Sequence, residues 1–210
     1  MDKNKTATIA KRVFDIFFSL TALILLSPFL LLLVILIPLT SRGNPIYSQK
    51  RIGRFGVPFK FFKFRTMHID AEKRLQSILA NNPSYKLEWD QIHKLKNDPR
   101  VTFIGAILRK TSMDELPQFI NVLKGEMSVV GPRPVLHEEI VKHFGDKAKD
   151  VLSVRPGLTG LWQTSGRNNT TYAERVALDA RYACSWSLKQ DFKIIAKTIP
   201  AILYKNDGAF

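Results

Sequence analysis

Two adjacent carboxylates, Asp114 and Glu115, are the residues of this sequence best suited to phosphate chemistry. Carboxylate oxygens bind Mg²⁺, and an ionised aspartate can attack phosphorus. At the start of a helix, the positive end of the helix dipole would help to keep both groups ionised. Ser112 precedes Glu115 by three residues, which is the spacing of a capping box. The pair is therefore either a reactive carboxylate site or a plain helix cap.

Five basic residues lie in settings that suit phosphate recognition. Arg109, five residues before Asp114, could hold a phosphate under attack. Prolines flank Arg133 and one follows Arg155, and because proline fixes φ these loops direct a guanidinium at little entropic cost. Lys63 and Arg65 alternate with apolar residues, so the pattern places both on one face of a strand. Exposed turns and a solvated strand face are the alternative interpretations.

The uncharged run 16–41 predicts a membrane helix. As a helix it would be roughly 39 Å long, more than a hydrocarbon core of about 30 Å requires. Pro28 costs about 3 kcal/mol or more inside a helix, and the hydroxyl of Ser27 can bond to a carbonyl that the proline leaves free. Lys and Arg flank both ends of the run, whereas a spanning helix carries them mainly on one side. We expect a flexible terminus over 1–10 and a re-entrant helix-break-helix over 11–41; a kinked spanning helix is the alternative.

The charge distribution indicates an anionic partner. The net charge is +14, and residues 1–75 hold 13 of the 32 Lys and Arg but only 4 of the 18 Asp and Glu. Anionic lipid attracts such juxtamembrane cations by about 1 kcal/mol per residue. Neither zinc-ligand spacing nor an aromatic-basic RNA motif is present, so nucleic acid is not an expected partner. The single Cys184 excludes an internal disulfide and fits a reducing compartment.

The remaining pattern predicts a small, mostly helical α+β domain over 42–210, with short strands within 46–67. Helices are expected over 70–95 with a break near Asn81–Pro83, then over 102–110, 115–123, 135–152 and 171–183. From Leu188 the apolar positions are spaced four, three, four and three residues apart. This stripe predicts either an interfacial amphipathic helix or a helix packed on the core, and Pro200 weakens a long helix in both cases.

Taken together, the motifs resemble those of the bacterial sugar transferases, the monotopic polyprenyl-phosphate phosphoglycosyl transferases. The resemblance covers roughly residues 10–210. Besides the Ser27–Pro28 pair, it rests on K-F-R-T-M at 63–67, N-D-P-R-V-T at 97–102, L-R-K-T-S-M-D-E-L-P-Q at 108–118, G-E-M-S-V-V-G-P-R-P at 125–134 and R-P-G-L-T-G-L-W-Q at 155–163. The segment 165–182 is similar to members that transfer hexose 1-phosphate in O-antigen or exopolysaccharide synthesis.

The resemblance implies roles for individual residues. Asp114 matches the family's nucleophile, and Glu115 matches the acidic partner that supports Mg²⁺. The other matches to motif positions are Lys63, Arg109, Arg133 and the Ser27–Pro28 break.

The implied reaction has two steps. Asp114 attacks the β-phosphorus of a UDP-sugar, with galactose or glucose preferred, and UMP leaves. Polyprenyl phosphate, usually undecaprenyl phosphate, then takes the phosphosugar from the aspartate. The implied location is the cytoplasmic face of the bacterial inner membrane, with anionic lipid as a further partner and a homo-oligomer left open. A membrane-anchored, non-catalytic scaffold protein is the alternative function.

Overall fold

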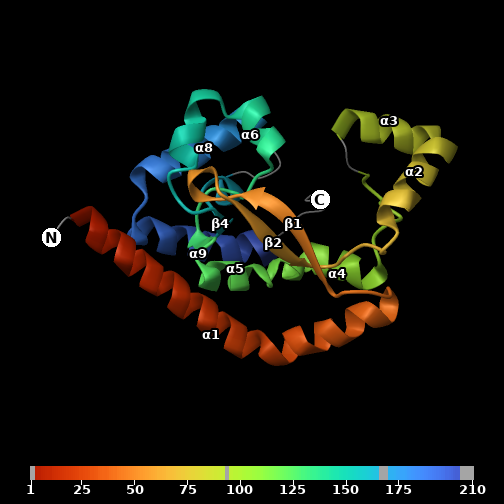
Figure 1. The fold of residues 1–210 in the computed structure, drawn as a ribbon, viewed down its shortest axis with the longest axis horizontal. Coiled ribbons are helices and arrows are strands. Elements are labelled where there is room, and N and C mark those ends of the chain that lie inside the picture. The colour runs from red at the N-terminus through yellow and green to blue at the C-terminus, as the bar shows by residue number, and fades with distance from the viewer. Residues whose placement is uncertain (1–2, 93–94, 166–169, 204–210) are drawn as a thin grey trace.

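The computed structural model describes residues 3–92, 95–165 and 170–203 (Figure 1). A long N-terminal helix, α1 (Lys3–Thr40), lies along one side of a compact α+β domain. In Figure 1 this helix bends near its middle, so that both of its ends lie toward the domain. Pro28 accounts for the bend, because sharp kinks in helices arise where proline removes a hydrogen bond.

Two expectations about this segment need correction. Residues 3–10 are already helical, although a flexible terminus was expected over 1–10; residues 1–2 lie outside the described part. The helix also continues through Pro28, so the expected break is a bend within one helix, and its re-entrant topology stays a prediction. The predicted compensation is confirmed, since Ser27 Oγ donates to the carbonyl of Ile24, 2.8 Å away, where Pro28 has no N–H to offer.

Most of the apolar surface of α1 is uncovered. Within the described residues, Thr6–Thr40 is the one helical stretch long and apolar enough to cross a membrane, and only 11% of its apolar window is buried. Phe17, Leu25 and Leu39 are each at least 70% exposed. A core helix of a soluble domain would bury such side chains, so this surface requires lipid or a protein partner.

The strands form two small sheets, of which only the first lies in the segment where strands were predicted. β1 (Ile46–Ile52) and β2 (Pro58–Phe64) are antiparallel, with Tyr47 opposite Lys63, and the turn between them contains a short 3-10 helix, η1 (Arg54–Gly56). β3 (Ser128–Val130) and β4 (Gly157–Thr159) are parallel. The strands predicted within 46–67 are therefore confirmed.

Helices make up most of the remaining fold, as the sequence predicted. The predicted break near Asn82 separates α2 (Ala71–Asn81) from α3 (Pro83–Ile92). α4 (Phe103–Thr111), the 3-10 helix η2 (Met113–Glu115) and α5 (Gln118–Lys124) follow. The C-terminal part contains α6 (His137–His143), η3 (Gly145–Lys147), α7 (Ala148–Val151), η4 (Trp162–Thr164), α8 (Tyr172–Ser185) and α9 (Leu188–Leu203).

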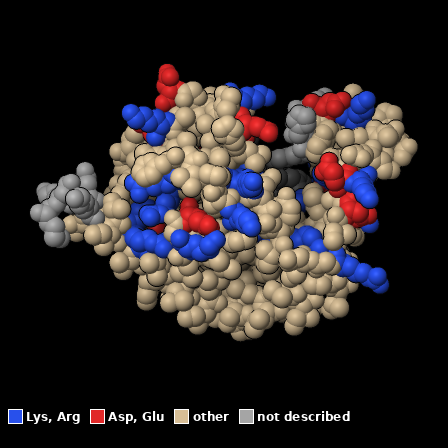
Figure 2. Space-filling view, in the orientation of Figure 1, with Lys and Arg blue, Asp and Glu red and all other residues tan. Residues whose placement is uncertain are grey.

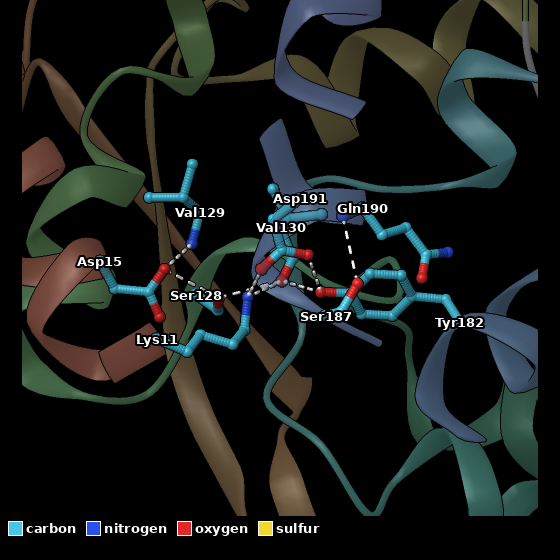
Figure 3. A network of polar contacts seen from close by, with 9 residues as sticks. All are labelled: Lys11, Asp15, Ser128, Val129, Val130, Tyr182, Ser187, Gln190 and Asp191. Carbon is cyan, nitrogen blue, oxygen red and sulfur yellow. Dashed lines mark hydrogen bonds and ion pairs between the residues drawn. The ribbon is translucent and has the colours of Figure 1, made fainter. Parts of the chain in front are cut away.

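A buried polar network joins α1 to the C-terminal part of the domain (Figure 3). Lys11 Nζ lies 2.6 Å from Asp191 Oδ2 and donates to the carbonyl of Val130. Tyr182 donates its hydroxyl to Asp191 Oδ1, 2.7 Å away. One turn along α1, Asp15 accepts from the Ser128 hydroxyl and from a β3 amide. Because an unpaired buried charge is costly, these contacts fix the first half of α1 on β3 and α9.

The helix that begins at Leu188 packs on the domain. Asp191 and Ile194 of α9 are buried, whereas Phe192 and Ile199 are more than half exposed. The helix also continues through Pro200. The core-packing alternative is therefore confirmed for one face, and an interfacial role of the exposed face stays a prediction.

Candidate active site

Lys63, Asp114 and Glu115 form one charged group. Lys63 Nζ lies 3.2 Å from Asp114 Oδ2 and 2.7 Å from Glu115 Oε1. The carboxylate-bearing side chain of Asp114 is 10% exposed, while those of Lys63 and Glu115 are about one third exposed. The arrangement offers a buried carboxylate with a cation beside it and a second carboxylate facing solvent.

Asn121 positions this group by joining α5 to β2. Its side-chain amide donates to the Lys60 carbonyl over 2.6 Å and accepts from the Phe62 amide over 3.2 Å. Asn121 is fully buried, so these bonds satisfy polar groups that water cannot reach. The strand that carries Lys63 is thereby held against the helix that directly follows Glu115.

Arg109 belongs to the same region through its contact with Thr66. The start of α4 is tied to the end of β2, because the Thr102 amide donates to the Thr66 carbonyl, 3.0 Å away. A Cβ on Gly105 would lie 2.0 Å from that carbonyl oxygen, so only glycine permits this approach. Two turns into α4, Arg109 Nε donates to Thr66 Oγ1 over 2.9 Å. The contact with Thr66, just after the end of β2, therefore sets the direction of the Arg109 guanidinium.

Burial raises the pKa of Asp114 above its ordinary value, and the negative charge of Glu115 acts in the same direction. The charges of Lys63 and Arg109 oppose this shift. The pKa of Arg109 is lowered by burial, and the nearby carboxylates of Asp114 and Asp98 counteract the effect. A carboxylate that is poorly hydrated and held beside a cation suits nucleophilic attack on a polyanionic substrate.

The capping-box interpretation of Ser112 and Glu115 is wrong. Ser112 has φ 57° and ends α4 in the left-handed conformation, with its amide donating to the carbonyls of Arg109 and Leu108. Its side chain makes no capping bond to η2. Glu115 is paired with Lys63, a long-range contact that local spacing does not indicate.

Two of the predicted phosphate-binding residues lie elsewhere. Arg65 follows the end of β2 and donates to the carbonyls of Ser41 and Gly43, so it holds the end of α1. Arg155 donates to the Gly125 carbonyl, 2.7 Å away, at the C-terminal end of α5. Asp114 and Glu115 precede the opposite end of that helix.

Arg133 is connected to the charged group by a row of cations and aromatic rings. Lys63 and Arg51 lie 5.7 and 5.8 Å from the centre of the Phe61 ring. Arg51 is close enough to Arg133 for their charges to interact. Arg133 in turn lies 5.7 Å from the centre of the Trp162 ring. These cations and rings could bind the part of a long anionic substrate that extends away from Asp114.

The carboxylates fit Mg²⁺ only as part of a larger coordination shell. In the described part of the chain, no three His, Cys, Asp or Glu side chains come together as a metal site. Mg²⁺ commonly takes one or two carboxylates together with substrate phosphates and water. Asp114 and Glu115 supply hard oxygens of this kind, and the Lys63 ammonium already lies between them as a cation.

Large apolar side chains are exposed on three helices that lie close above α1 in Figure 1. They are Phe103 and Ile107 on α4, Ile120 on α5, and Phe192 and Ile199 on α9. The lower rim of the molecule along α1 shows no Lys, Arg, Asp or Glu, and Lys and Arg lie above it (Figure 2). The helices next to the candidate site therefore extend the uncharged, apolar surface of α1.

Sequence reasoning did not single out Thr66, Trp162 or Asp98 as site residues. Thr66 and Asp98 stand in K-F-R-T-M and N-D-P-R-V-T, two segments already recognised as motifs. Asp98 forms a buried, forked ion pair with Arg100, with contacts of 2.6 to 3.0 Å, beside Arg109. The position of each residue within a recognised motif was the available signal, but its contact partner could not be chosen without the fold.

Comparison with known proteins assigns the chain to a family. A model described as bacterial sugar transferase matches residues 6–205. The exopolysaccharide production protein ExoY of Rhizobium meliloti (strain 1021) is 49% identical over 193 residues, which cover 92% of this chain and 85% of that relative. The chain therefore belongs to the bacterial sugar transferase family.

Two further relatives have names that state a reaction. The undecaprenyl-phosphate galactose phosphotransferase of Salmonella typhimurium (strain LT2) is 44% identical over 207 residues, 98% of this chain but 43% of that relative. The UDP-glucose:undecaprenyl-phosphate glucose-1-phosphate transferase of Caulobacter vibrioides is 38% identical over 207 residues, 95% of this chain and 72% of the relative. Together with the exposed apolar length of α1, this kinship indicates a membrane-associated transferase.

Proposed function

We propose that the chain transfers a hexose 1-phosphate, from UDP-galactose or UDP-glucose, to undecaprenyl phosphate and releases UMP. The observation that carries the proposal is the buried carboxylate of Asp114 beside Lys63 and Glu115, in a chain whose relatives are named for this transfer. The product would be undecaprenyl-diphosphate-hexose, the first lipid-linked unit of a surface polysaccharide.

In the first step Asp114 attacks the β-phosphorus of the UDP-sugar. A carboxylate-oxygen-to-phosphorus bond forms, and the bond between the β-phosphorus and the bridging oxygen breaks, so UMP leaves with that oxygen. Lys63 favours the ionised form of Asp114 against the effect of burial, and its charge offsets that of the diphosphate. Arg109, directed by Thr66, binds the phosphate under attack.

In the second step a phosphate oxygen of undecaprenyl phosphate attacks the same phosphorus. The bond to Asp114 breaks and the carboxylate is restored. Neither step breaks the bond between the sugar C1 and its oxygen, so the anomeric configuration is retained. Arg133, which lies over the Trp162 ring, would bind the nucleotide end of the donor.

Mg²⁺ would be held by Asp114 and Glu115 together with diphosphate oxygens, and when bound it would neutralise charge on the leaving UMP. The membrane position follows from α1, whose basic flanks both favour the cytoplasmic face. This face of the inner membrane is where a UDP-sugar and the lipid phosphate can meet.

The test combines turnover with trapping of the intermediate. The whole chain, purified in detergent, is incubated with undecaprenyl phosphate and a panel of UDP-sugars, and UMP is measured for each. Without the lipid, wild type should gain the mass of a hexose phosphate on the peptide that contains Asp114. Asp114→Asn should lose both signals, because an amide does not displace UMP, whereas Asp146→Asn, an exposed carboxylate elsewhere, should keep both.

Other outcomes would refute the assignment. Turnover by Asp114→Asn within tenfold of wild type, or a label on a different peptide, would show that another residue is the nucleophile. If no UDP-sugar released UMP, the non-catalytic membrane scaffold would be the better interpretation.

A further inference from the structure

A second group of arginines lines a pocket beside the first half of α1. Arg12 of α1, Arg54 of η1 and Arg155, which precedes β4, lie around it, and Trp186 forms part of its wall. We refer to Arg12, Arg54 and Arg155 as the arginine pocket. Figure 2 shows Lys and Arg side chains gathered on the left of the molecule, above the uncharged rim.

The three guanidinium groups are anchored by backbone carbonyls. Arg12 donates to the carbonyls of Val122 and Leu123 in the last turn of α5, over 2.6 and 2.9 Å. Through Nε, Arg54 and Arg155 each donate to one carbonyl over 2.7 Å. Each side chain is thus fixed in direction without losing its charge.

Carboxylates balance their charges only in part, because Asp15 lies near enough to Arg12 for the two charges to interact. Among the described residues, none of the three lies within ion-pair distance of an Asp or Glu, and the Nη groups of Arg54 and Arg155 make no hydrogen bond. The guanidinium of Arg54 lies over the Phe55 ring, 4.4 Å from its centre. Asp15, which also lines the pocket, already accepts two hydrogen bonds from Ser128 and Val129. The pocket therefore keeps a net positive charge and unused donors.

Partial burial and the charge of Arg155 both lower the pKa of Arg54. Like charges that converge in a pocket repel one another, and an anion bound between them would relieve this repulsion. A phosphate group fits, because it accepts hydrogen bonds from several guanidinium groups at once.

The position of the pocket favours a lipid as the source of that phosphate. Asp114 and Arg155 lie at opposite ends of α5, which is seven residues and so about 10 Å long. Arg12 stands four positions before the uncharged run, at the level where a helix entering a bilayer meets the headgroups. Its neighbours Ile9 and Val13 are more than 60% exposed and could contact acyl chains.

We propose that Arg12, Arg54 and Arg155 form a second anion site, separate from Asp114, which binds the phosphate of an anionic phospholipid headgroup. The proposal needs membrane association but not the transferase reaction. A bound lipid would connect the turn that contains η1, the loop before β4 and the first half of α1, and so fix the depth of the domain at the membrane.

The first experiment compares two lipids and two variants. The whole chain in detergent is given dioleoylphosphatidylglycerol or dioleoylphosphatidylcholine, and bound lipid is counted by native mass spectrometry. Wild type should retain the anionic lipid at least about fivefold better, and Arg54→Gln should lose most of this preference. The control is Arg42→Gln, an exposed arginine beyond the other end of α1, which should behave as wild type. Equal loss in both variants, or in neither, would overturn the site.

The second experiment separates a lipid phosphate from a nucleotide phosphate. Calorimetric titration with UMP should give the same affinity for wild type and Arg54→Gln within about twofold. If UMP binding weakened while lipid retention did not, the arginines would belong to the nucleotide site and the proposal would fail. This readout does not depend on turnover, so failure of the transferase proposal is distinguished from failure of the lipid site.

The third measurement uses the unaltered chain, so it does not depend on whether a variant folds. Hydrogen exchange is followed after addition of either lipid. The anionic lipid should slow exchange at residues 53–57 and 153–157 and leave residues 113–117 unchanged. The same exchange with both lipids at 53–57 and 153–157 would exclude a headgroup site there.

Discussion

The ammonium group of Lys63 lies 3.2 Å from the carboxylate of Asp114, although 51 positions separate the two residues along the chain. The contact joins a strand to a 3-10 helix, and the charge of Lys63 partly offsets the rise that burial causes in the pKa of Asp114. Because the cation favours the ionised carboxylate, the reactivity of Asp114 should depend on Lys63 as well as on its own surroundings.

Lys63→Met should therefore alter the pH dependence of the reaction. Removing the cation raises the pKa of Asp114 further, so the acid limb of the kcat/KM profile should move to higher pH. At neutral pH we expect a loss of about 100-fold, which is typical for a group that stabilises charge at a reacting centre. The profile is measured by UMP release between pH 5 and 9. Lys60→Met, an exposed lysine of the same strand, should retain the wild-type profile.

Removal of divalent metal should abolish turnover. Asp114 and Glu115 are the acidic pair at the site, and a diphosphate that loses UMP needs its charge neutralised. UMP release should stop in EDTA and return with Mg²⁺ or Mn²⁺, and Glu115→Gln should be impaired by about 100-fold or more. Wild-type rates in EDTA, with metal absent by elemental analysis, would contradict the metal-assisted site.

Asp179 should make stability depend on pH. Burial raises its pKa to about 7, and the backbone amide of Arg133 only partly offsets this. Since an unfolded chain has an Asp pKa near 3.9, the folded state binds more protons between about pH 4 and 7, and stability falls as pH rises through that window. Between pH 5 and 8 the free energy of unfolding of Asp179→Asn should decrease by about 2 kcal/mol less than that of wild type.

Thermal unfolding of the purified chain at pH 5 and pH 8 measures the difference. Asp150→Asn, at an exposed position, serves as the control and should show the wild-type decrease. If Asp179→Asn lost stability between pH 5 and 8 as much as wild type does, Asp179 would be ionised throughout that range in the folded protein.

The membrane topology can be tested with single cysteines. The bend of α1 at Pro28 and the cations on both flanks predict that residues 3 and 50 lie on the same, cytoplasmic side. Lys3→Cys and Lys50→Cys, each in a Cys184→Ser background, should resist an impermeant thiol reagent until the cells are opened. Pro28→Ala should favour a straight helix and expose residue 3 outside. Labelling of Lys3→Cys from outside in the otherwise native chain would establish the kinked spanning helix.

Local sequence patterns predicted much of the fold. The alternation in F-K-F-F-K-F and the Gly-Pro turn before it predict the hairpin, and the proline at position 28 predicts the disturbance of α1. The extent of that disturbance was not accessible, because the Ser27 hydroxyl and the surrounding turns keep the helix continuous. Propensity gives the cost of proline but not how the structure compensates for it.

The sequence predicted most residues of the candidate site but not how they are arranged in space. Strand alternation places Lys63 and Arg65 on one face, but β2 ends at Phe64 and Arg65 turns to the end of α1. The proline after Arg155 restricts its backbone, but the distance of Arg155 from Asp114 depends on the packing of α5. Contacts between distant segments decide these positions, and no local spacing encodes them.

The buried pair of Lys11 and Asp191 has a consequence for how the protein can be handled and made in the cell. A truncated chain that begins at the first strand would leave Asp191 without its cation and Ser128 without Asp15, in a core that water does not reach. Breaking a buried pair in this way costs about 3 to 5 kcal/mol, a large share of the stability of a small domain. The catalytic domain should therefore not be obtainable as a soluble fragment, and its folding should be completed only after the first helix has been delivered to the bilayer.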